Sequence, residues 1–304
     1  MIMANPLAAL TGARGIEAGK PGLLVRPAVQ EDRQMIADLI LFEPHVHRHL
    51  DWRGPLEWLG YPPYFVTEQN RVAAAALACP PDPGSIAWIR LFAHASHLTG
   101  PSAWSPLWDA VRRELSMHGG ATVAAICMQR WFESILLESG FSLYQHIVLL
   151  EWSEQPIGQV FIPADIQIRK MALDDLPRIV EVDAAAFEPL WHNSLGALTQ
   201  AFSQALYATV AEDASGLIGY QLSTGNSFGA HLARLAVRPA SQGHGIGLAL
   251  VRDLILNLEE RKCLTRITVN TQANNATSLA LYHKLGFQRT GEQFPVYICK
   301  VGPV

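Results

Sequence analysis

The sequence predicts an α/β protein of two tandem domains, each a mixed β-sheet flanked by helices. Three observations predict this fold. The chain has 304 residues, which is enough for two ordinary domains. Its 49% hydrophobic and 16% charged residues are typical of a globular protein with a sizeable core. Strand and helix patterns alternate along the C-terminal half, and their order recurs in the N-terminal half.

The C-terminal half opens with strands and one helix. A strand is predicted at 166–170 and a helix at 176–187. A hairpin follows, because the strand patterns at 206–213 and 216–225 are joined by a short turn that ends in glycine. The next strand, 230–238, is stopped by a proline.

The rest of this half alternates helices and strands. Apolar residues recur at every fourth position from Ile246 to Leu258, which predicts one buried face of a helix reaching about Lys262. A strand at 265–272 and a helix at 276–285 come next. For that helix, Asn275 is the expected N-cap and Gly286 the left-handed residue after the C-terminus. The pattern at 296–301 predicts the last strand.

The N-terminal half repeats this plan. Residues 23–40 match 166–183 in pattern, 87–96 match 230–239, and 132–141 match 278–287. The spacing agrees as well: Arg90 follows Arg26 by 64 residues, and Arg234 follows Arg169 by 65. We therefore predict a diverged duplication. Its parts are a loose tail (1–22), a first domain (23–152), a linker (153–165) and a second domain (166–304).

Composition and charge exclude several classes of protein. A net charge of −4 argues against a general nucleic-acid binder. No apolar run reaches the length of a membrane span, and the first 22 residues lack the pattern of a signal peptide. The cysteines are far apart and form no CxxC pair, which favours reduced thiols in a cytoplasmic protein over disulfides or a zinc site. These cysteines are Cys79, Cys127, Cys263 and Cys299.

A glycine-rich loop separates the strand 230–238 from the helix that follows it. Closely spaced glycines let the backbone approach a ligand, and a helix N-terminus adds partial positive charge, so this arrangement favours binding of a phosphate group. The alternative is a tight connection without a ligand. The loop consists of Gln242, Gly243, His244, Gly245, Ile246 and Gly247.

Two motifs in this half resemble those of the GCN5-related N-acetyltransferase (GNAT) superfamily. The first is Gln/Arg-x-x-Gly-x-Gly/Ala, carried here by Gln242, Gly245 and Gly247. The second is Asn-x-x-(small)-x-x-Leu-Tyr-x-x-Leu-Gly-Phe. It is carried by Asn275, Ser278, Leu281, Tyr282, Leu285, Gly286 and Phe287. The resemblance covers roughly residues 166–302.

The resemblance implies a sheet splayed between its fourth and fifth strands, with acetyl-CoA in the opening and no metal. Leu235 and Val237 would hydrogen-bond the pantetheine arm as an added strand would, and Asn275 would face the cofactor. The pyrophosphate would be held by the glycine loop. The residues implied there are Gln242, Gly243, His244, Gly245, Ile246, Gly247 and Leu248.

Acyl transfer to an amine needs a base, an oxyanion donor and an acid for the departing thiolate. The resemblance assigns the acid to Tyr282, whose alternative role is to anchor the helix on the sheet. The Val237 N–H is the expected oxyanion donor. His231 is the candidate base, because residues 231, 233, 235 and 237 would share one face of a strand.

Other members of the superfamily carry a glutamate base on the fifth strand. Here that position holds Asn270, which cannot take up a proton. This departure weakens a further likeness to the alanine acetyltransferases that modify ribosomal proteins, which rests on residues 187–194. Glu188 and His192, in the loop expected to face the acceptor, are further candidates for the base.

The first domain has lost these motifs. When Arg90 is aligned with Arg234, Pro101 replaces Gly245 and removes an N–H where a phosphate would need one. When Gly140 is aligned with Gly286, Leu136 stands opposite Tyr282, and Gln129 stands opposite Asn275. We therefore expect this degenerate copy not to bind acetyl-CoA conventionally.

A histidine cluster in the first domain has two interpretations. His45, His47 and His49, with Asp51 next, would form a metal-binding face on a strand. The flanking pattern does not resemble a strand, however, so we expect a solvated or substrate-facing loop instead.

The sequence as a whole predicts an acetyl-CoA-dependent N-acetyltransferase with its active site in the second domain. The acceptor would be a small-molecule amine or a peptide N-terminus, recognised mainly by residues 184–205. The alternative is a non-catalytic acyl-CoA sensor or assembly module. It remains open because Asn270 stands where a glutamate base would.

Overall fold

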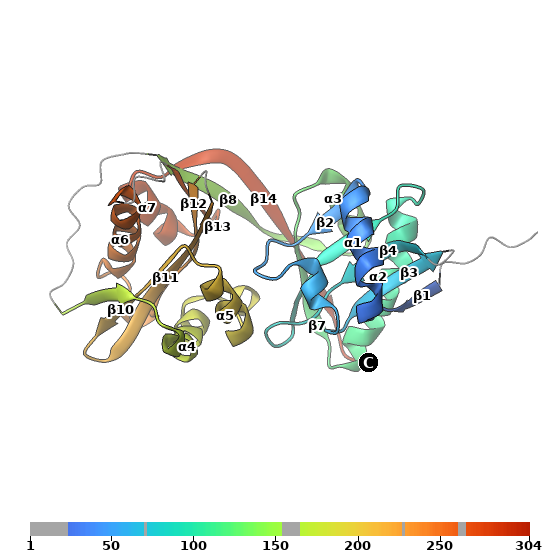
Figure 1. Cartoon of the computed structure of the whole chain (residues 1–304), viewed down its shortest axis with the longest axis horizontal. Helices are drawn as coiled ribbons and strands as arrows, with labels where there is room; N and C mark the ends of the chain where they lie inside the picture. The colour runs from blue at the N-terminus through green and yellow to red at the C-terminus, as the bar shows by residue number, and fades with distance from the viewer. Residues whose placement is uncertain (1–23, 70–71, 154–164, 227–228, 261–265) are drawn as a thin grey trace, which may run out of the picture.

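The computed structural model describes residues 24–69, 72–153, 165–226, 229–260 and 266–304. We call 24–153 the N-terminal half and 165–304 the C-terminal half. The halves lie side by side and are bridged by two long strands, β8 (Ser142–Ser153) and β14 (Gln288–Val301) (Figure 1). The predicted tail, most of the linker and Cys263 lie outside the described residues.

The C-terminal half has the predicted order of elements. Gly216, at φ 109°, closes the β10–β11 hairpin as expected. Two features differ from the sequence prediction: a helix occupies Leu195–Ser203, and β14 begins at Gln288 rather than near residue 296. The elements are β9 (Gln167–Lys170), α4 (Leu176–Ala186), α5 (Leu195–Ser203), β10 (Tyr207–Asp213), β11 (Gly216–Asn226), β12 (Gly229–Val237), α6 (Ile246–Glu260), β13 (Arg266–Gln272), α7 (Ala276–Lys284) and β14.

The N-terminal half follows a similar order but adds β2, has the short strands β5 and β6 where the C-terminal half has β12, and has no α-helix among its described residues in the place of α5. The histidine segment His45–Arg48 is a strand, so the expectation of a loop there was wrong. The elements are β1 (Leu24–Pro27), α1 (Arg33–Phe42), β2 (His45–Arg48), β3 (Tyr64–Gln69), β4 (Val72–Ala78), β5 (Ile86–Trp88), β6 (Leu91–His94), α2 (Gly100–Met117), β7 (Ala121–Ile126), α3 (Arg130–Glu138) and β8.

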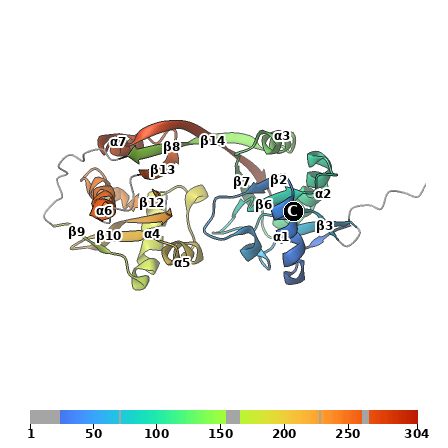
Figure 2. The same ribbon diagram turned by 45° about the horizontal axis from the view of Figure 1, so that its top comes forward.

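The two halves have exchanged their last strands. The larger sheet has nine strands in the order β5-β7-β14-β8-β13-β12-β11-β10-β9, and the smaller has the order β1-β3-β4-β6-β2. Strand β8 of the N-terminal half pairs with all of β13, and β14 of the C-terminal half pairs with all of β7. Figure 2 shows β8 and β14 crossing the top of the molecule between α7 and α3. Each half therefore completes its partner's sheet.

A repeated ion-pair cluster confirms that the halves are equivalent. In each, an arginine on the first strand binds two carboxylates with N–O distances of 2.6–3.1 Å. One carboxylate lies six residues later and also accepts a backbone N–H, and the other is the second-last residue of the hairpin's first strand. The two sets are Arg26, Asp32 and Glu68, and Arg169, Asp175 and Glu212.

Strand register corrects the predicted alignment by one residue. Ala78 and Leu222 each lie ten residues after the glutamate of this cluster, and they pair with Leu91 and Arg234. Leu91, rather than Arg90, is therefore equivalent to Arg234. The helices agree, because the same shift matches the buried residues of α2 to those of α6. The matched sets are Leu107, Val111 and Leu115, and Leu250, Leu254 and Leu258.

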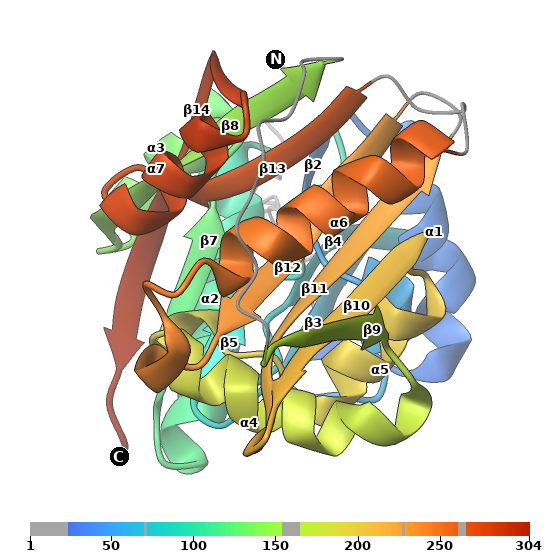
Figure 3. The ribbon, with the colours of Figure 1, turned by 90° about the vertical axis from the view of Figure 1, so that its left-hand side faces the viewer.

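Helices cover both faces of the C-terminal sheet. Figure 3 shows α6 lying across β10, β11 and β12, with α4 and α5 toward the opposite face. The core beneath α6 and α7 includes Leu232, Leu254 and Phe287. A separate apolar cluster joins the halves, where Leu190 meets Trp88. The candidate site lies between these two cores.

Candidate acyl-donor cleft

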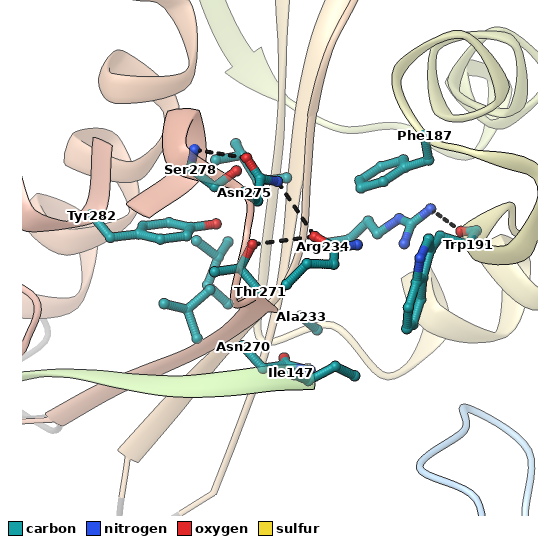
Figure 4. A pocket seen from close by; sticks show the side chains of 14 residues that line it. Ile147, Phe187, Trp191, Ala233, Arg234, Asn270, Thr271, Asn275, Ser278 and Tyr282 are labelled. Carbon is teal, nitrogen blue, oxygen red and sulfur yellow. Dashed lines mark hydrogen bonds between the residues drawn. The ribbon is translucent and has the colours of Figure 1, made fainter. Parts of the chain in front are cut away.

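A cleft opens where β12 and β13 diverge. Their parallel pairing runs from Ala230 to Leu232 and ends there. The resemblance to the GNAT superfamily implied such a splay at these two strands. The cleft is lined by Ile147, Phe187, Trp191, Leu232, Ala233, Arg234, Leu235, Val269, Asn270, Thr271, Gln272, Asn275, Ser278 and Tyr282 (Figure 4).

The β12 edge presents backbone groups to this cleft. The Arg238 N–H donates to the Ile218 carbonyl at 2.7 Å, on the β11 side. Because partners alternate along an antiparallel strand, the N–H and C=O groups of Leu235 and Val237 point away from β11. The Gln242 side chain confirms this direction, since its amide donates to the Val237 carbonyl at 3.0 Å. Leu235 and Val237 are therefore placed as the predicted strand edge for a ligand.

The glycine loop has the backbone geometry of an anion cradle. Gly243 and Gly245 lie at φ 82° and 84°, in the left-handed region that other residues rarely adopt. Helix α6 begins directly afterwards at Ile246, and the first N–H groups of a helix have no partner within it. Ile246 and Leu248 have buried side chains, so only their backbones can face a ligand. The exposed His244 side chain lies against the Ser241 carbonyl at 3.4 Å.

Gly247 permits a close approach between helices. A Cβ atom at this position would lie 2.9 Å from Leu281 Cδ1 of α7. A larger residue would therefore require the end of the Leu281 side chain to shift. The second glycine of the first motif thus brings α6 and α7 into close contact.

Asn275 both caps α7 and lines the cleft. Its Oδ1 accepts from the Ser278 N–H at 3.0 Å, which confirms the predicted N-cap. Its Nδ2 donates to Gln272 Oε1 at 3.4 Å (Figure 4). Gly286, at φ 91°, follows the end of the helix as predicted.

Tyr282 is buried with its hydroxyl turned toward the cleft (Figure 4). Its ring packs on Phe287 with centroids 5.6 Å apart, so it also anchors α7 on the sheet. Burial raises the pKa of the phenol above its ordinary value. The group therefore keeps its proton near neutral pH, as an acid must before it donates.

His231 does not share a face with Leu235 and Val237, which corrects the sequence prediction. The register between β11 and β12 shifts after Leu232, and such a bulge reverses the alternation of side chains. His231 lies where β12 is still paired with β13, beside the cleft. Its Nδ1 is 2.9 Å from Thr268 Oγ1 and its Nε2 is 3.0 Å from Asn270 Oδ1. Burial lowers the pKa of the imidazole.

The sequence prediction missed a buried ion pair at the wall of the cleft. Arg234 donates to both Asp183 oxygens at 2.8 Å and to the Trp191 carbonyl at 2.6 Å. Its guanidinium lies 3.6 Å from the centroid of the Phe187 ring. Tyr220 also donates to Asp183, which is fully buried. The sequence feature that could have revealed this pair is Asp183, an aspartate on the apolar face of α4.

This ion pair fixes the segment 187–194, which leads into α5. The segment then reaches the N-terminal half: the Trp191 and Trp88 rings lie 5.3 Å apart, and the Tyr144 hydroxyl donates to Glu188 at 2.8 Å. His192 is held by the Phe187 carbonyl at 2.9 Å. Neither Glu188 nor His192 is among the residues that line the cleft in the described ranges.

Apolar, buried side chains stand at the equivalent places of the N-terminal half. Counted from Gly140 and Gly286, Phe132 takes the place of Ser278, and the fully buried Leu136 that of Tyr282. Counted through the corrected register, Gly100 takes the place of Gly243, and Pro101 takes that of His244 rather than that of Gly245 as predicted. Gly100 already belongs to α2, so helix replaces the loop.

The histidines of β2 are packed, which corrects the expectation of a solvated loop. His47 is 3% exposed and stacks on Phe132, while His45 stacks on His94. Across the described ranges, no three histidine, cysteine, aspartate and glutamate side chains gather as a metal site requires. In the same ranges no helix is both long and apolar enough to cross a membrane.

Comparisons with known proteins agree with this geometry. Residues 176–287 match the family model described as "Acetyltransferase (GNAT) family". A mycothiol acetyltransferase of Amycolatopsis mediterranei (strain U-32) is 32% identical over 133 residues, which cover 38% of this chain and 43% of that protein. The match thus spans less than half of this relative.

Solved structures resemble nearly the whole chain. A tandem GNAT protein from the clavulanic acid biosynthesis pathway has a TM-score of 0.63 at 16% identity, covering 93% of this chain and 99% of that one. A GCN5-related N-acetyltransferase from Sphaerobacter thermophilus has a TM-score of 0.61 at 17% identity, covering 93% and 97%. At these identities the likeness shows the fold alone, which is the tandem arrangement predicted from the sequence.

Proposed function

Residues 176–287 form a domain of the GNAT acetyltransferase family within a tandem GNAT fold, and on this premise we propose that the chain is an acetyl-CoA-dependent N-acetyltransferase. The observation that carries the proposal is the cleft itself. The β12 edge at Leu235 and the Tyr282 side chain line one cleft, and the left-handed glycine loop follows β12 directly along the chain. These are the groups needed to hold an extended amide arm, bind a pyrophosphate and protonate a leaving thiolate.

The proposed binding mode uses mainly the backbone. The N–H and C=O groups of Leu235 and the C=O group of Val237 pair with the pantetheine arm, and the N–H groups of 243–248 surround the pyrophosphate. Asn275 keeps α7 in place beside the arm. No metal takes part in this proposal.

The proposed reaction is direct attack of a neutral amine on the thioester carbonyl. The C–N bond forms as the carbonyl oxygen becomes an oxyanion, which the Val237 N–H stabilises. Collapse then breaks the C–S bond, and the Tyr282 O–H gives its proton to the departing thiolate. The nitrogen, positively charged after the attack, loses one proton to solvent, and the Tyr282 phenolate regains a proton from solvent.

We propose a positioning role for His231 rather than the role of base. Both ring nitrogens are already engaged by neighbouring side chains, Nδ1 at 2.9 Å from Thr268 Oγ1 and Nε2 at 3.0 Å from Asn270 Oδ1. Asn270 lines the cleft and His231 does not, in the part of the chain that the structure describes. In this proposal His231 acts through Asn270, which it holds at the wall of the cleft.

The proposed acceptor is a small-molecule amine or a peptide N-terminus, held near 187–205. One relative is named a mycothiol acetyltransferase, so a panel of amines for the assay should include mycothiol-type amines. The described cysteines Cys79, Cys127 and Cys299 are free, and we propose a cytoplasmic location on that ground.

Thiol release from acetyl-CoA across this panel tests the function. We expect Tyr282→Phe to lower turnover at least 100-fold, within the range of general acid catalysis, while CoA affinity stays within a few-fold. His231→Ala should lower turnover only a few-fold and leave the acid limb of the pH–rate profile in place. Unchanged turnover in the Tyr282 variant would refute its assignment as the acid.

A non-catalytic acyl-CoA sensor is the second candidate. The observation in its favour is the chemistry of the cleft, whose lining in the described ranges contains no carboxylate and no imidazole. A sensor would bind CoA and release no thiol with any amine of the panel. The wild-type protein in the same assay therefore separates the two functions.

A further inference from the structure

Strand β2 pairs with the edge of β6. It is the outermost strand of the smaller sheet, and its register sets His47 opposite Phe92 and His45 opposite His94. One residue beyond the end of β2, the His49 N–H donates to the Arg90 carbonyl at 3.2 Å. Bonded pairs alternate along an antiparallel ladder, so His45 and His47 are the residues whose N–H groups face β6.

This edge of β6 is equivalent to the open edge in the C-terminal half. The corrected register matches Phe92 with Leu235 and His94 with Val237. In the C-terminal half, the N–H and C=O groups of Leu235 and Val237 point away from β11, to the side where β12 and β13 diverge. In the N-terminal half, those of Phe92 and His94 face β2 instead. The chain's own strand thus lies where a ligand's amide arm would lie.

Side chains fill the space around β2. The His45 and His94 rings stack 4.6 Å apart, and Trp131 meets both rings edge-on at 5.3 and 5.7 Å. His47 stacks on Phe132 with centroids 4.3 Å apart. Through these ring contacts, α3 packs on both β2 and β6.

The segment that follows β2 is tied to the C-terminal half. Asp51 pairs with the buried Arg90 at 2.8 Å. The next carbonyl, of Trp52, accepts from the Gln204 side chain at 2.9 Å, directly after α5. A second contact joins Ser194 to Asp82 at 3.0 Å. Strand β2 therefore covers the edge of β6, and the segment that follows it contacts the end of α5.

We propose that β2 is an internal substitute for the pantetheine arm, so that the N-terminal half is a self-occupied copy of the acyl-CoA site. The chain then binds one acyl-CoA molecule, in the C-terminal half. The former site instead supports the loop that braces the acceptor side. The comparison with a ligand rests on the proposed function of the C-terminal cleft, whereas the pairing of β2 does not.

Amide hydrogen exchange in the full-length chain, with and without CoA, tests this proposal. We expect the amides of Phe92 and His94 to be protected without CoA and unchanged by it. The amides of Leu235 and Val237 should exchange rapidly alone and slow at least ten-fold with CoA. Fast exchange at Phe92 and His94 without CoA, or slowing there on its addition, would overturn the proposal. Protection of β6 without any effect of CoA on β12 would support the proposal for β2 and count against the C-terminal cofactor site.

Two variants of β2 sharpen the test. His47→Pro removes an N–H that faces β6, whereas Val46→Pro removes one that faces away. The amides of Phe92 and His94 should exchange at least ten-fold faster in the first variant and at the wild-type rate in the second. Equal rates in both variants would contradict the pairing. Should His47→Pro fail to fold, equilibrium dialysis of the wild type decides: one CoA per chain is expected, and two would overturn the proposal.

Discussion

At the scale of single residues, Gly245 shows how backbone conformation makes a binding group. Its φ of 84° turns the loop so that successive N–H groups converge. A β-branched residue there would favour an extended backbone, since the left-handed region costs about 1–2 kcal/mol for residues other than glycine. We expect Gly245→Val to weaken CoA binding at least ten-fold by isothermal titration.

The matched control for that variant is Gly216→Val. Gly216 lies at φ 109° in the β10–β11 turn, and a Cβ there would meet nothing within 4 Å. It carries similar backbone strain away from the cleft, so its CoA affinity should stay within two-fold of the wild type. Equal weakening in both variants would mean that strain, rather than the cradle, governs binding.

The burial of His47 predicts that the chain loses stability in acid. Burial lowers its pKa to about 4 in the folded chain, against 6.5 for an ordinary histidine. Between these values the unfolded chain takes up a proton that the folded chain does not, so the free energy of unfolding falls as the pH falls. The loss approaches roughly 3 kcal/mol near pH 4.

Urea unfolding from pH 7 to pH 4 measures this loss. His47→Gln, which cannot take up that proton, should show a shallower decline over the same range. A variant that is less stable at every pH but has the wild-type pH dependence would show that His47 is not the group responsible.

The position of His231 marks the limit of sequence prediction for single side chains. Strict alternation put it on the face of Leu235 and Val237, and the bulge after Leu232 reversed that order. A bulge is set by pairing with another strand, which a local pattern does not contain. The cap at Asn275 and the turn at Gly216 were predictable because their geometry depends on neighbouring residues alone.

At the scale of elements, α7 depends on its N-cap. Asn275 Oδ1 satisfies the Ser278 N–H, one of the first N–H groups that the helix leaves unpaired. We expect Asn275→Ala to lower the free energy of unfolding by about 1 kcal/mol, measured by urea titration. Asn275→Ser should keep most of the stability, because serine also caps helices.

Binding separates the structural role of this residue from its proposed role at the cofactor. Asn275 also lines the cleft, so Asn275→Ala should weaken CoA binding by more than Asn275→Ser does. Equal affinities for CoA in the two variants would leave Asn275 with the capping role alone.

The elements themselves were predicted unevenly. Helices α6 and α7 carry strong periodicity or clear caps, and both were predicted close to their observed bounds. Strand β2 is four residues long, and its pairing with β6 bridges more than forty residues of sequence. Its histidines satisfy no apolar pattern, since they are buried by stacking on other rings. Helix α5 was missed as well, although its Ser194 cap was present in the sequence.

At the scale of the whole molecule, sequence repeats divide the chain differently from hydrogen bonds. The predicted domains, 23–152 and 166–304, follow the repeat. The sheets do not, because β8 completes the C-terminal half and β14 completes the N-terminal half. A sequence repeat shows which segments are copies of one another. A strand that is exchanged between the halves keeps its sequence and pairs with a different strand, so the repeat does not show the exchange. Nothing in the pattern of β8 or β14 distinguishes the two pairings.

Expressing the halves separately tests the exchange. Residues 1–155 alone would leave β7 without β14, and 165–304 alone would leave β13 without β8. We expect each half to be aggregated or unfolded alone and the two to form a soluble complex when co-expressed, as judged by size-exclusion chromatography and circular dichroism. A folded monomer of either half alone would contradict a requirement for the exchanged strand.

The exchange also sets an order for synthesis on the ribosome. Strand β7 ends at Ile126, but its partner β14 starts at Gln288, about 160 residues later. At roughly 5–20 residues per second, the edge of β7 stays unpaired for about 10–30 s while the C-terminal half is made. The N-terminal half is therefore the first to be translated and the last to be closed, and that edge is where a nascent-chain chaperone would bind.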